Sequence, residues 1–314
     1  MIEVRNISKH FGSTVAVQNV SFDVARGEVL GFLGPNGAGK STTMRILTGY
    51  IPPSEGSARI AGHDLLEDSL AIRRRIGYLP ENAPLYGDME VVDFLRFVGT
   101  IRGIPPGEMR ERIARMVKLC GLEKVVGRTI QHLSKGYRQR VGLAQAMIHD
   151  PDILILDEPT SGLDPNQIME IRELIKELGR EKTVMLSTHI LPEVSATCGR
   201  VLIVNEGMLV ASGSPEELGA GLEGGGLLRV QVRAPSREVL DEKLRDAEFV
   251  TEHVFTKEAD GDLHHLTIRG VDARGLGERI FRLVVENGWS LAELRLEGAT
   301  LEDVFRRITR GEEA

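Results

Sequence analysis

The feature that most constrains the fold is the glycine-rich run "GPNGAGKST" at residues 34–42. The apolar stretch "EVLGFL" precedes it with the pattern of a strand, and "TMRILTG" follows it with the pattern of a helix ending at Gly49. Glycines let backbone N–H groups turn inward without Cβ clashes, and the start of the following helix adds about half a positive charge. A strand, a loop and a helix in this order therefore predict a cradle for phosphate groups. An ordinary glycine-rich turn is the alternative, and the flanking elements disfavour it.

The spacing G-x-x-x-x-G-K-S gives particular side chains of this loop an expected role. Lys40 would contact the β- and γ-phosphates of a nucleotide, Ser41 would ligate Mg²⁺, and Thr42 would bind phosphate. The nucleotide-binding residues that we expect in this loop are Gly34, Pro35, Asn36, Gly37, Ala38, Gly39, Lys40, Ser41 and Thr42.

Two acidic residues end a buried-strand pattern further along the chain. In "ILILDEP", a continuous apolar run of the kind found in buried parallel strands leads directly to Asp157 and Glu158. The carboxyl ends of such strands meet at the edge of the sheet where ligands bind. We expect Asp157 to hold Mg²⁺ through water and Glu158 to orient or deprotonate an attacking water. A strand that ends in a solvated turn is the alternative, and the phosphate loop favours the first interpretation.

A second anion-binding pattern lies at "HLSKGYRQR", residues 132–140. A Ser-x-Gly turn that opens a helix presents backbone N–H groups to an anion, although a serine that merely caps the helix is the alternative. The chain would then carry two phosphate sites at two helix starts.

Four motifs together resemble the ATP-binding subunit of an ABC transporter: "GPNGAGKST", "LSKGYRQR", "LILDEPTSGLDP" and "STH", in that order. The second is similar to the ABC signature sequence. The resemblance covers residues 2–218 and implies an α/β P-loop NTPase fold: a RecA-like core, an antiparallel β subdomain and a helical subdomain at about residues 82–132. It also implies that two copies dimerise head to tail, so that each ATP lies between one phosphate loop and Ser134, Lys135 and Gly136 of the other copy.

The same resemblance assigns three further residues. Phe11 stands where the family stacks an aromatic ring on adenine; a core phenylalanine is the alternative. Asp164, in "SGLDP", matches a loop that reaches across the dimer. His189, in "STH", matches a histidine that contacts the γ-phosphate, and its place after the strand pattern "TVMLS" favours that role over a structural one.

Glu81, in "GYLPENAPLY", is a departure from the family pattern. The corresponding loop usually carries a glutamine that touches Mg²⁺ and the attacking water and faces the membrane partner. A carboxylate there is repelled by phosphates and attracted by the metal. Our hypothesis is that Glu81 ligates Mg²⁺ and makes nucleotide engagement more dependent on the metal. A side chain that points at solvent and does little is the alternative.

Composition and patterning organise the rest of the chain. Five glycines in residues 219–226 predict a flexible linker between an ATPase domain at 1–218 and an accessory domain at 227–314. The patterns after the linker give the order β-α-β-β-α-β and a last helix, "TLEDVFRRITR", which suggests a small ferredoxin-like α+β domain. The formal net charge of −7 argues against a nucleic-acid partner, and the two distant cysteines suit a reducing compartment.

These features predict an ATPase that powers export through a separate integral membrane permease. "YLPENAPLY" and the final helix resemble exporter subunits, including gliding-motility and multidrug or polysaccharide exporters. The chain lacks a signal-peptide core and an apolar run of membrane-spanning length, so we expect it on the cytoplasmic face of the membrane. An ABC-type ATPase of translation or DNA repair, and a non-catalytic nucleotide-binding regulator, are the alternatives. One phosphate loop without sustained heptads argues against the first, and Glu158 with His189 against the second.

Overall fold

The computed structural model describes residues 1–220, 227–257, 261–270, 273–297 and 305. The chain divides into two units, Met1–Pro215 and Glu216–Ala314, and each is described by itself. Helix α8 (Pro215–Ala220) includes the first two residues of the expected linker. The remainder of that linker, residues 221–226, lies outside the described residues, as does the expected last helix apart from Phe305.

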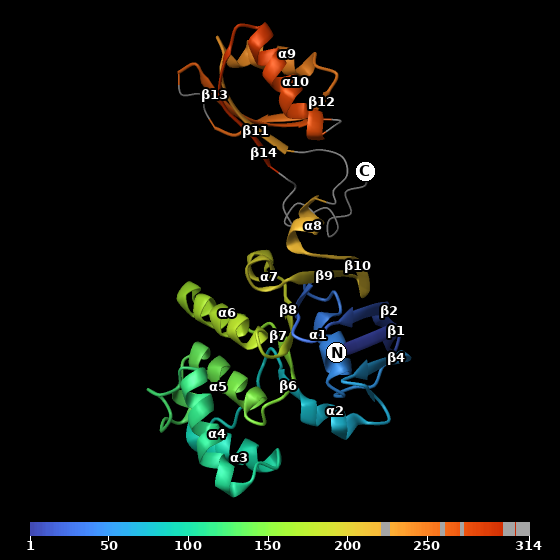
Figure 1. Ribbon diagram of the computed structural model, residues 1–314, viewed down its shortest axis with the longest axis vertical. Coiled ribbons are helices and arrows are strands. Elements are labelled where there is room, and N and C mark those ends of the chain that lie inside the picture. Colours follow the sequence, from blue (N-terminus) through green and yellow to red (C-terminus); the bar gives the residue numbers. More distant parts are fainter. Residues whose placement is uncertain (221–226, 258–260, 271–272, 298–304, 306–314) are drawn as a thin grey trace. The chain divides into compact units, whose positions relative to one another are not determined.

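A six-stranded sheet with the order β10-β9-β3-β8-β7-β6 forms the core of the first unit (Figure 1). Its strands are β3 (Val29–Leu33), β6 (Ile76–Leu79), β7 (Ile153–Asp157), β8 (Thr183–Thr188), β9 (Arg200–Asn205) and β10 (Met208–Gly213). They run parallel except for β10, which pairs antiparallel with β9. Strands β7 and β8 are buried along their whole length, as continuous apolar runs predict. Their carboxyl ends meet at one edge of the sheet.

A second, antiparallel sheet has the order β2-β1-β4-β5. Its strands are β1 (Ile2–Phe11), β2 (Thr14–Val24), β4 (Glu55–Ile60) and β5 (His63–Asp64), drawn in blue beside α1 in Figure 1. Alternate residues of β1 and β2 are buried in a cluster that also contains residues of the central sheet. The rings of Phe22 and Phe32, one from each sheet, have centroids 5.8 Å apart. One apolar core therefore holds the two sheets together.

Helices complete this unit. They are α1 (Lys40–Leu47), α2 (Ser69–Arg75), α3 (Val91–Ile101), α4 (Pro106–Leu119), α5 (Lys135–Met147), α6 (Pro165–Gly179) and α7 (Leu191–Thr197), with a 3-10 turn at Ile130–His132. Helices α3, α4 and α5 contact one another (Figure 1). Parallel sheet, antiparallel β subdomain and helical subdomain confirm the predicted fold class. Among the described helices, each is too short or too polar to cross a lipid bilayer.

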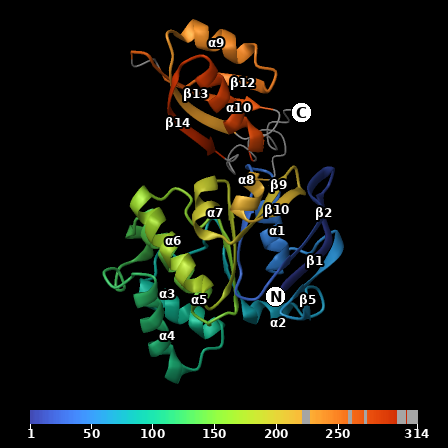
Figure 2. The ribbon, with the colours of Figure 1, turned by 45° about the horizontal axis from the view of Figure 1, so that its top comes forward.

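The second unit has the element order β-α-β-β-α-β. The elements are β11 (Leu227–Arg233), α9 (Arg237–Arg245), β12 (Val250–Phe255), β13 (Leu263–Gly270), α10 (Ala273–Glu286) and β14 (Ser290–Glu297). The sheet order β12-β13-β11-β14 is antiparallel throughout, the arrangement of a ferredoxin-like unit. One apolar cluster contains residues of β11, β13, α9 and α10, so both helices cover the same face of the sheet (Figure 2).

Candidate functional site

The glycine-rich loop joins β3 to α1, which begins at Lys40. Gly39 precedes the helix with φ +97°, and a Cβ there would lie 2.5 Å from the carbonyl oxygen of Ala16. A Cβ on Gly34 would lie 2.4 Å from the carbonyl oxygen of Val204. Real Cβ atoms do not approach backbone oxygens so closely, so both positions require glycine. The loop is fixed by neighbouring backbone rather than left free.

Lys40 is buried at the centre of this loop, with 6% of its surface exposed. Its Nζ donates hydrogen bonds to the carbonyl oxygens of Gly34 at 2.8 Å and Pro35 at 3.1 Å. The same Nζ lies 3.4 Å from Oε1 of Glu158. A buried ammonium group is stable only when it is paired in this way. The basic residue of the loop and the expected base of the reaction therefore share one ion pair.

Asp157, at the end of β7, is 1% exposed and collects two hydroxyl groups. Ser41 Oγ donates to Asp157 Oδ1 at 3.1 Å, and Ser187 Oγ donates to the same oxygen at 2.5 Å. The serine and aspartate that we assigned to Mg²⁺ thus lie in direct contact, and their oxygens are the donors that this ion prefers. Among the described residues, no group of three or more His, Cys, Asp or Glu could hold a metal by itself. Such a site suits an ion that also takes substrate phosphates and water as ligands.

Ser187 was not expected from the sequence. It ends the apolar run of β8, and the register of the sheet places it directly opposite Asp157. A single serine in an apolar strand gave only a weak signal, because its partner becomes known only once β7 and β8 are paired.

Glu158 adopts a left-handed backbone conformation, with φ +49°. Its amide donates to Ser187 O and to Ser187 Oγ, each at 3.1 Å. Its Oε2 lies 2.9 Å from Nδ1 of His189, whose side chain is 42% exposed. Such a conformation is uncommon for a residue with a Cβ and persists where the surroundings hold it. The turn after β7 therefore fixes the carboxylate of Glu158 between Lys40 and His189.

A cavity of about 430 Å³ connects these groups. Its lining consists of Ala16, Asn36, Gly37, Gly39, Lys40, Ser41, Thr42, Glu81, Glu158, Ser161 and His189. Glu81 is exposed and still borders this cavity, together with the phosphate loop and the two expected catalytic residues. Ala16 and Ser161 were not expected. Ala16, in β2, borders the cavity because its carbonyl oxygen lies against Gly39 of the loop. Ser161 borders it through the turn after Glu158, in which the amide of Ser161 donates to the carbonyl oxygen of Glu158.

Phe11 and the residues expected to act across a dimer are not among the described residues that line this cavity. Phe11 is 51% exposed, so the core alternative is wrong, and Lys9 Nζ lies 5.3 Å from its ring centroid. Ser134 caps α5 by accepting from the amide of Tyr137 at 3.4 Å. Asp164 caps α6 by accepting from the amide of Gln167 at 3.0 Å.

The other two residues of the signature pattern pack close to α6 and the turn before it. A Cβ on Gly136 would lie 2.5 Å from Gln167 Oε1, and a Cβ on Gly162 would lie 2.1 Å from Lys135 Nζ. Within one chain, the second anion-binding pattern is therefore separate from the phosphate loop.

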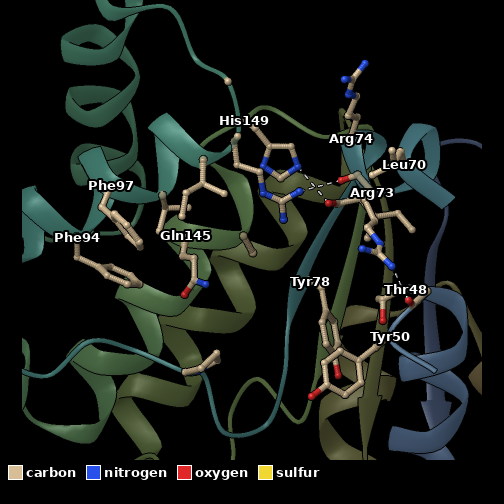
Figure 3. A pocket seen from close by; sticks show the side chains of 18 of the residues that line it. Thr48, Tyr50, Leu70, Arg73, Arg74, Tyr78, Phe94, Phe97, Gln145 and His149 are labelled. Carbon is tan, nitrogen blue, oxygen red and sulfur yellow. Dashed lines mark hydrogen bonds between the residues drawn. The ribbon is translucent and has the colours of Figure 1, made fainter.

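A larger cavity, of about 1030 Å³, is bordered by α2, α3 and β6 (Figure 3). Figure 3 shows Phe94 and Phe97 across it from Leu70 and Arg73. The described lining contains three arginines, Arg73, Arg74 and Arg102, and no acidic residue. Five of its large apolar or aromatic side chains are exposed: Tyr50, Leu70, Tyr86, Phe97 and Ile101.

Tyr78 and His149, two half-buried titratable residues, also line this larger cavity. Burial raises the pKa of Tyr78 to about 12. Burial, with the positive charge of Arg102, lowers the pKa of His149 to about 4, so this imidazole is uncharged at neutral pH. The arginines are therefore the charged groups of this surface.

In sequence, the chain is similar to ATP-binding proteins of ABC transporters. A family model described as ABC transporter matches residues 17–161. The probable multidrug ABC transporter ATP-binding protein YbhF of Escherichia coli (strain K12) is 40% identical over 221 residues, 70% of this chain and 38% of that protein. The Nod factor export ATP-binding protein I of Cupriavidus metallidurans is 36% identical over 219 residues, 69% of this chain and 72% of that protein.

A solved structure has the same fold over the matched region. It is a dimeric, post-hydrolysis state of the ATP-binding cassette MJ0796 bound to ADP and Pi, with a TM-score of 0.63 and 27% sequence identity. The match covers 68% of this chain and 98% of that one. By contrast, this chain spans little more than a third of the length of YbhF.

Proposed function

Because this chain belongs to the family of ABC transporter ATP-binding proteins, as its motifs predict, we propose that it binds ATP and hydrolyses it to ADP and phosphate. The observation that carries this proposal is the cavity in which Lys40, Ser41, Glu158 and His189 meet. It combines a phosphate cradle at a helix start with a buried carboxylate that can accept a proton from water and a histidine hydrogen-bonded to that carboxylate.

Each residue of the cavity has a role in this reaction. The backbone of the loop and Lys40 bind and orient the β- and γ-phosphates. Glu158 orients the attacking water and accepts its proton, and His189, hydrogen-bonded to Glu158, contacts the γ-phosphate. Phe11, exposed at the end of β1, offers a ring for the adenine.

The donor set formed by Ser41 and Asp157 fits Mg²⁺, and Glu81 is the further carboxylate that we assign to this ion. When bound, Mg²⁺ neutralises charge that develops on the transferred phosphate. Ser187 keeps the Asp157 carboxylate turned toward Ser41 by donating to the same oxygen.

The substitution Glu158→Gln tests the proposed reaction. It keeps the size of the side chain and removes its ability to accept a proton, so ATP should still bind while hydrolysis falls by about 10²- to 10⁴-fold. Phosphate release and equilibrium nucleotide binding measure the two effects. Glu177→Gln, on the exposed side of α6, is the matched control and should keep normal turnover. Near-normal turnover of Glu158→Gln would show that another group is the base.

We further propose that the working form is a head-to-tail dimer. Ser134, Lys135, Gly136 and Asp164 lie outside the cavity of their own chain, which supports a role at the nucleotide of a second copy. The anion-binding start of α5 then serves the ATP held by the other phosphate loop. The relative MJ0796 is itself dimeric in its structure with ADP and Pi.

We propose that the larger cavity receives a segment of a separate integral membrane permease. Exposed aromatic and apolar side chains around it suit an apolar partner surface, and its three arginines suit a segment that also carries carboxylates. The chain would then lie on the cytoplasmic face of the membrane. Export as the direction of transport is supported by the exporter-like motifs and by the name of the Nod factor export relative.

Co-purification distinguishes this function from the other classes. We expect the chain to be recovered with a membrane protein, with no nucleic acid bound. Recovery with ribosomes or DNA would instead indicate a translation or repair ATPase.

A further inference from the structure

One buried carboxylate is not used in the proposed reaction and does not line the cavity. Glu193, on α7, is 3% exposed and is not among the residues that line the cavity. Its Oε1 accepts a hydrogen bond from Thr160 Oγ1 at 2.5 Å, and its Oε2 accepts one from Thr188 Oγ1 at 2.7 Å. Both threonines are buried as well. One carboxylate therefore joins two segments that are far apart in the sequence.

The two threonines stand next to the residues assigned to hydrolysis. Thr188 directly precedes His189, and Thr160 follows Glu158 by two positions. The amide of Glu158 donates to the carbonyl and hydroxyl oxygens of Ser187, and the backbone of Glu158 is in the left-handed region. A backbone in that region needs support from its surroundings, and the hydrogen bond from Thr160 to Glu193 supplies it two residues further on.

The chemistry of this site favours a carboxylate over a neutral amide. Thr188 Oγ1 already accepts a hydrogen bond from the amide of Ile190 at 3.0 Å, so its own proton has to find an acceptor. A carboxylate offers two oxygens and no competing proton, and it can satisfy both hydroxyl groups at once. Hydrogen bonds to a charged acceptor are about twice as strong as neutral ones. Arg172 of α6, with Nη2 4.0 Å from Oε1, is a nearby cation that offsets part of the cost of burying the charge.

We propose that Glu193 is a positioning residue. Its hydrogen bonds hold Thr160 and Thr188 against α7. Through these two threonines it fixes the positions of Glu158 and His189 relative to each other. This inference rests on the proposed ATPase reaction, in which those two residues act on the γ-phosphate and the water. A shift of about 1 Å in such a group can cost roughly a hundredfold in rate. Loosening the threonines should therefore lower turnover more than nucleotide binding.

The chain offers matched variants for the test. Thr160→Val and Thr188→Val keep shape and remove the hydroxyl, whereas Thr160→Ser and Thr188→Ser keep the hydroxyl. Thr197→Val is the control: it is on the same helix as Glu193, and its buried Oγ1 has no hydrogen-bond partner in the described part of the chain.

We expect each valine variant to lower kcat about tenfold or more, with KM for ATP changed less than threefold. The serine variants should restore kcat to within about twofold, and Glu193→Gln should resemble the valine variants. Glu193 has only a structural role if Thr160→Val and Thr188→Val have the same kcat as Thr197→Val. The same conclusion follows if their affinity for ATP and the midpoint temperature of their thermal unfolding fall in proportion to kcat.

Amide hydrogen exchange without nucleotide separates this inference from the proposed function. In the valine variants, residues 158–162 and 188–190 should exchange faster, and in Thr197→Val they should not. If the wild-type chain fails to hydrolyse ATP, the proposed function is refuted. The exchange measurement needs no hydrolysis and would still test the role of Glu193. Unchanged exchange in both valine variants would refute the role of Glu193.

Discussion

Lys40 and Glu158 form an ion pair inside the cavity, with Nζ 3.4 Å from Oε1, and both side chains are less than a tenth exposed. A phosphate group bound by the loop would compete with Glu158 for the same ammonium group. Glu158 would then keep His189 as its neighbour and become free to accept a proton from water. At the scale of single residues, we therefore expect nucleotide binding to free the Glu158 carboxylate from its ion pair with Lys40.

Glu81 is the residue whose charge most directly tests the metal dependence of the site. If it ligates Mg²⁺, Glu81→Gln should raise the Mg²⁺ concentration at half-maximal ATPase activity severalfold, because a charged ligand is lost. The same change should tighten metal-free ATP binding, because a carboxylate no longer repels the phosphates. ATPase activity titrated against Mg²⁺ measures the first effect. Asp88→Asn, exposed in the same loop, is the control. Superimposable curves for wild type and Glu81→Gln would contradict the hypothesis that Glu81 ligates Mg²⁺.

At the scale of elements, local patterns predicted the strands and helices that carry the site. The loop between β3 and α1 and the acids after β7 follow from glycine spacing and from a continuous apolar run. Contacts that depend on which strands lie side by side did not follow. Ser187 lies beside Asp157 because β7 pairs with β8. Glu193 lies beside Thr160 because of the position of α7 in the folded unit, which local patterns do not give.

The apolar face of helix α3 is a second case in which the local pattern predicted an element but not its surroundings. Its spacing predicts one apolar face that includes Leu95, Val98 and Ile101. Leu95 is fully buried, whereas Ile101 is 68% exposed at the rim of the larger cavity. Periodicity identifies which residues share a face, but where the neighbouring elements end decides how far along the helix that face is covered.

This difference gives a prediction for α3. Leu95→Ala removes buried contacts and should lower the free energy of unfolding by about 2–5 kcal/mol. Ile101→Ala should change it by no more than about 0.5 kcal/mol, because the side chain is largely solvated. Urea unfolding measures both. If the larger cavity receives the permease, Ile101→Ala should still reduce co-purification of the membrane partner, and full recovery of that partner would argue against docking at this rim.

At the scale of the whole molecule, Ser134 does not line the cavity of its own chain, so the proposed head-to-tail dimer would build each nucleotide site from two copies. Lys40→Ala disables the phosphate loop. Ser134→Asp keeps a side chain that can cap α5 but brings a negative charge to the ATP of the other copy. Each variant alone should be inactive. In a head-to-tail dimer of the two, both lesions fall in one site and the other site is intact.

Mixing the two inactive variants should therefore restore ATP hydrolysis, up to about a quarter of the wild-type rate if half of the dimers are mixed and the sites act independently. Phosphate release from equal mixtures, measured after subunit exchange, gives this value directly. Lys40→Ala mixed with Lys40→Ala, Glu158→Gln is the control and should stay inactive, because every phosphate loop in that mixture is disabled. If the two sites act independently, failure of the complementary mixture, with mixed dimers demonstrated by a tag on one variant, would mean that Ser134 acts within its own chain.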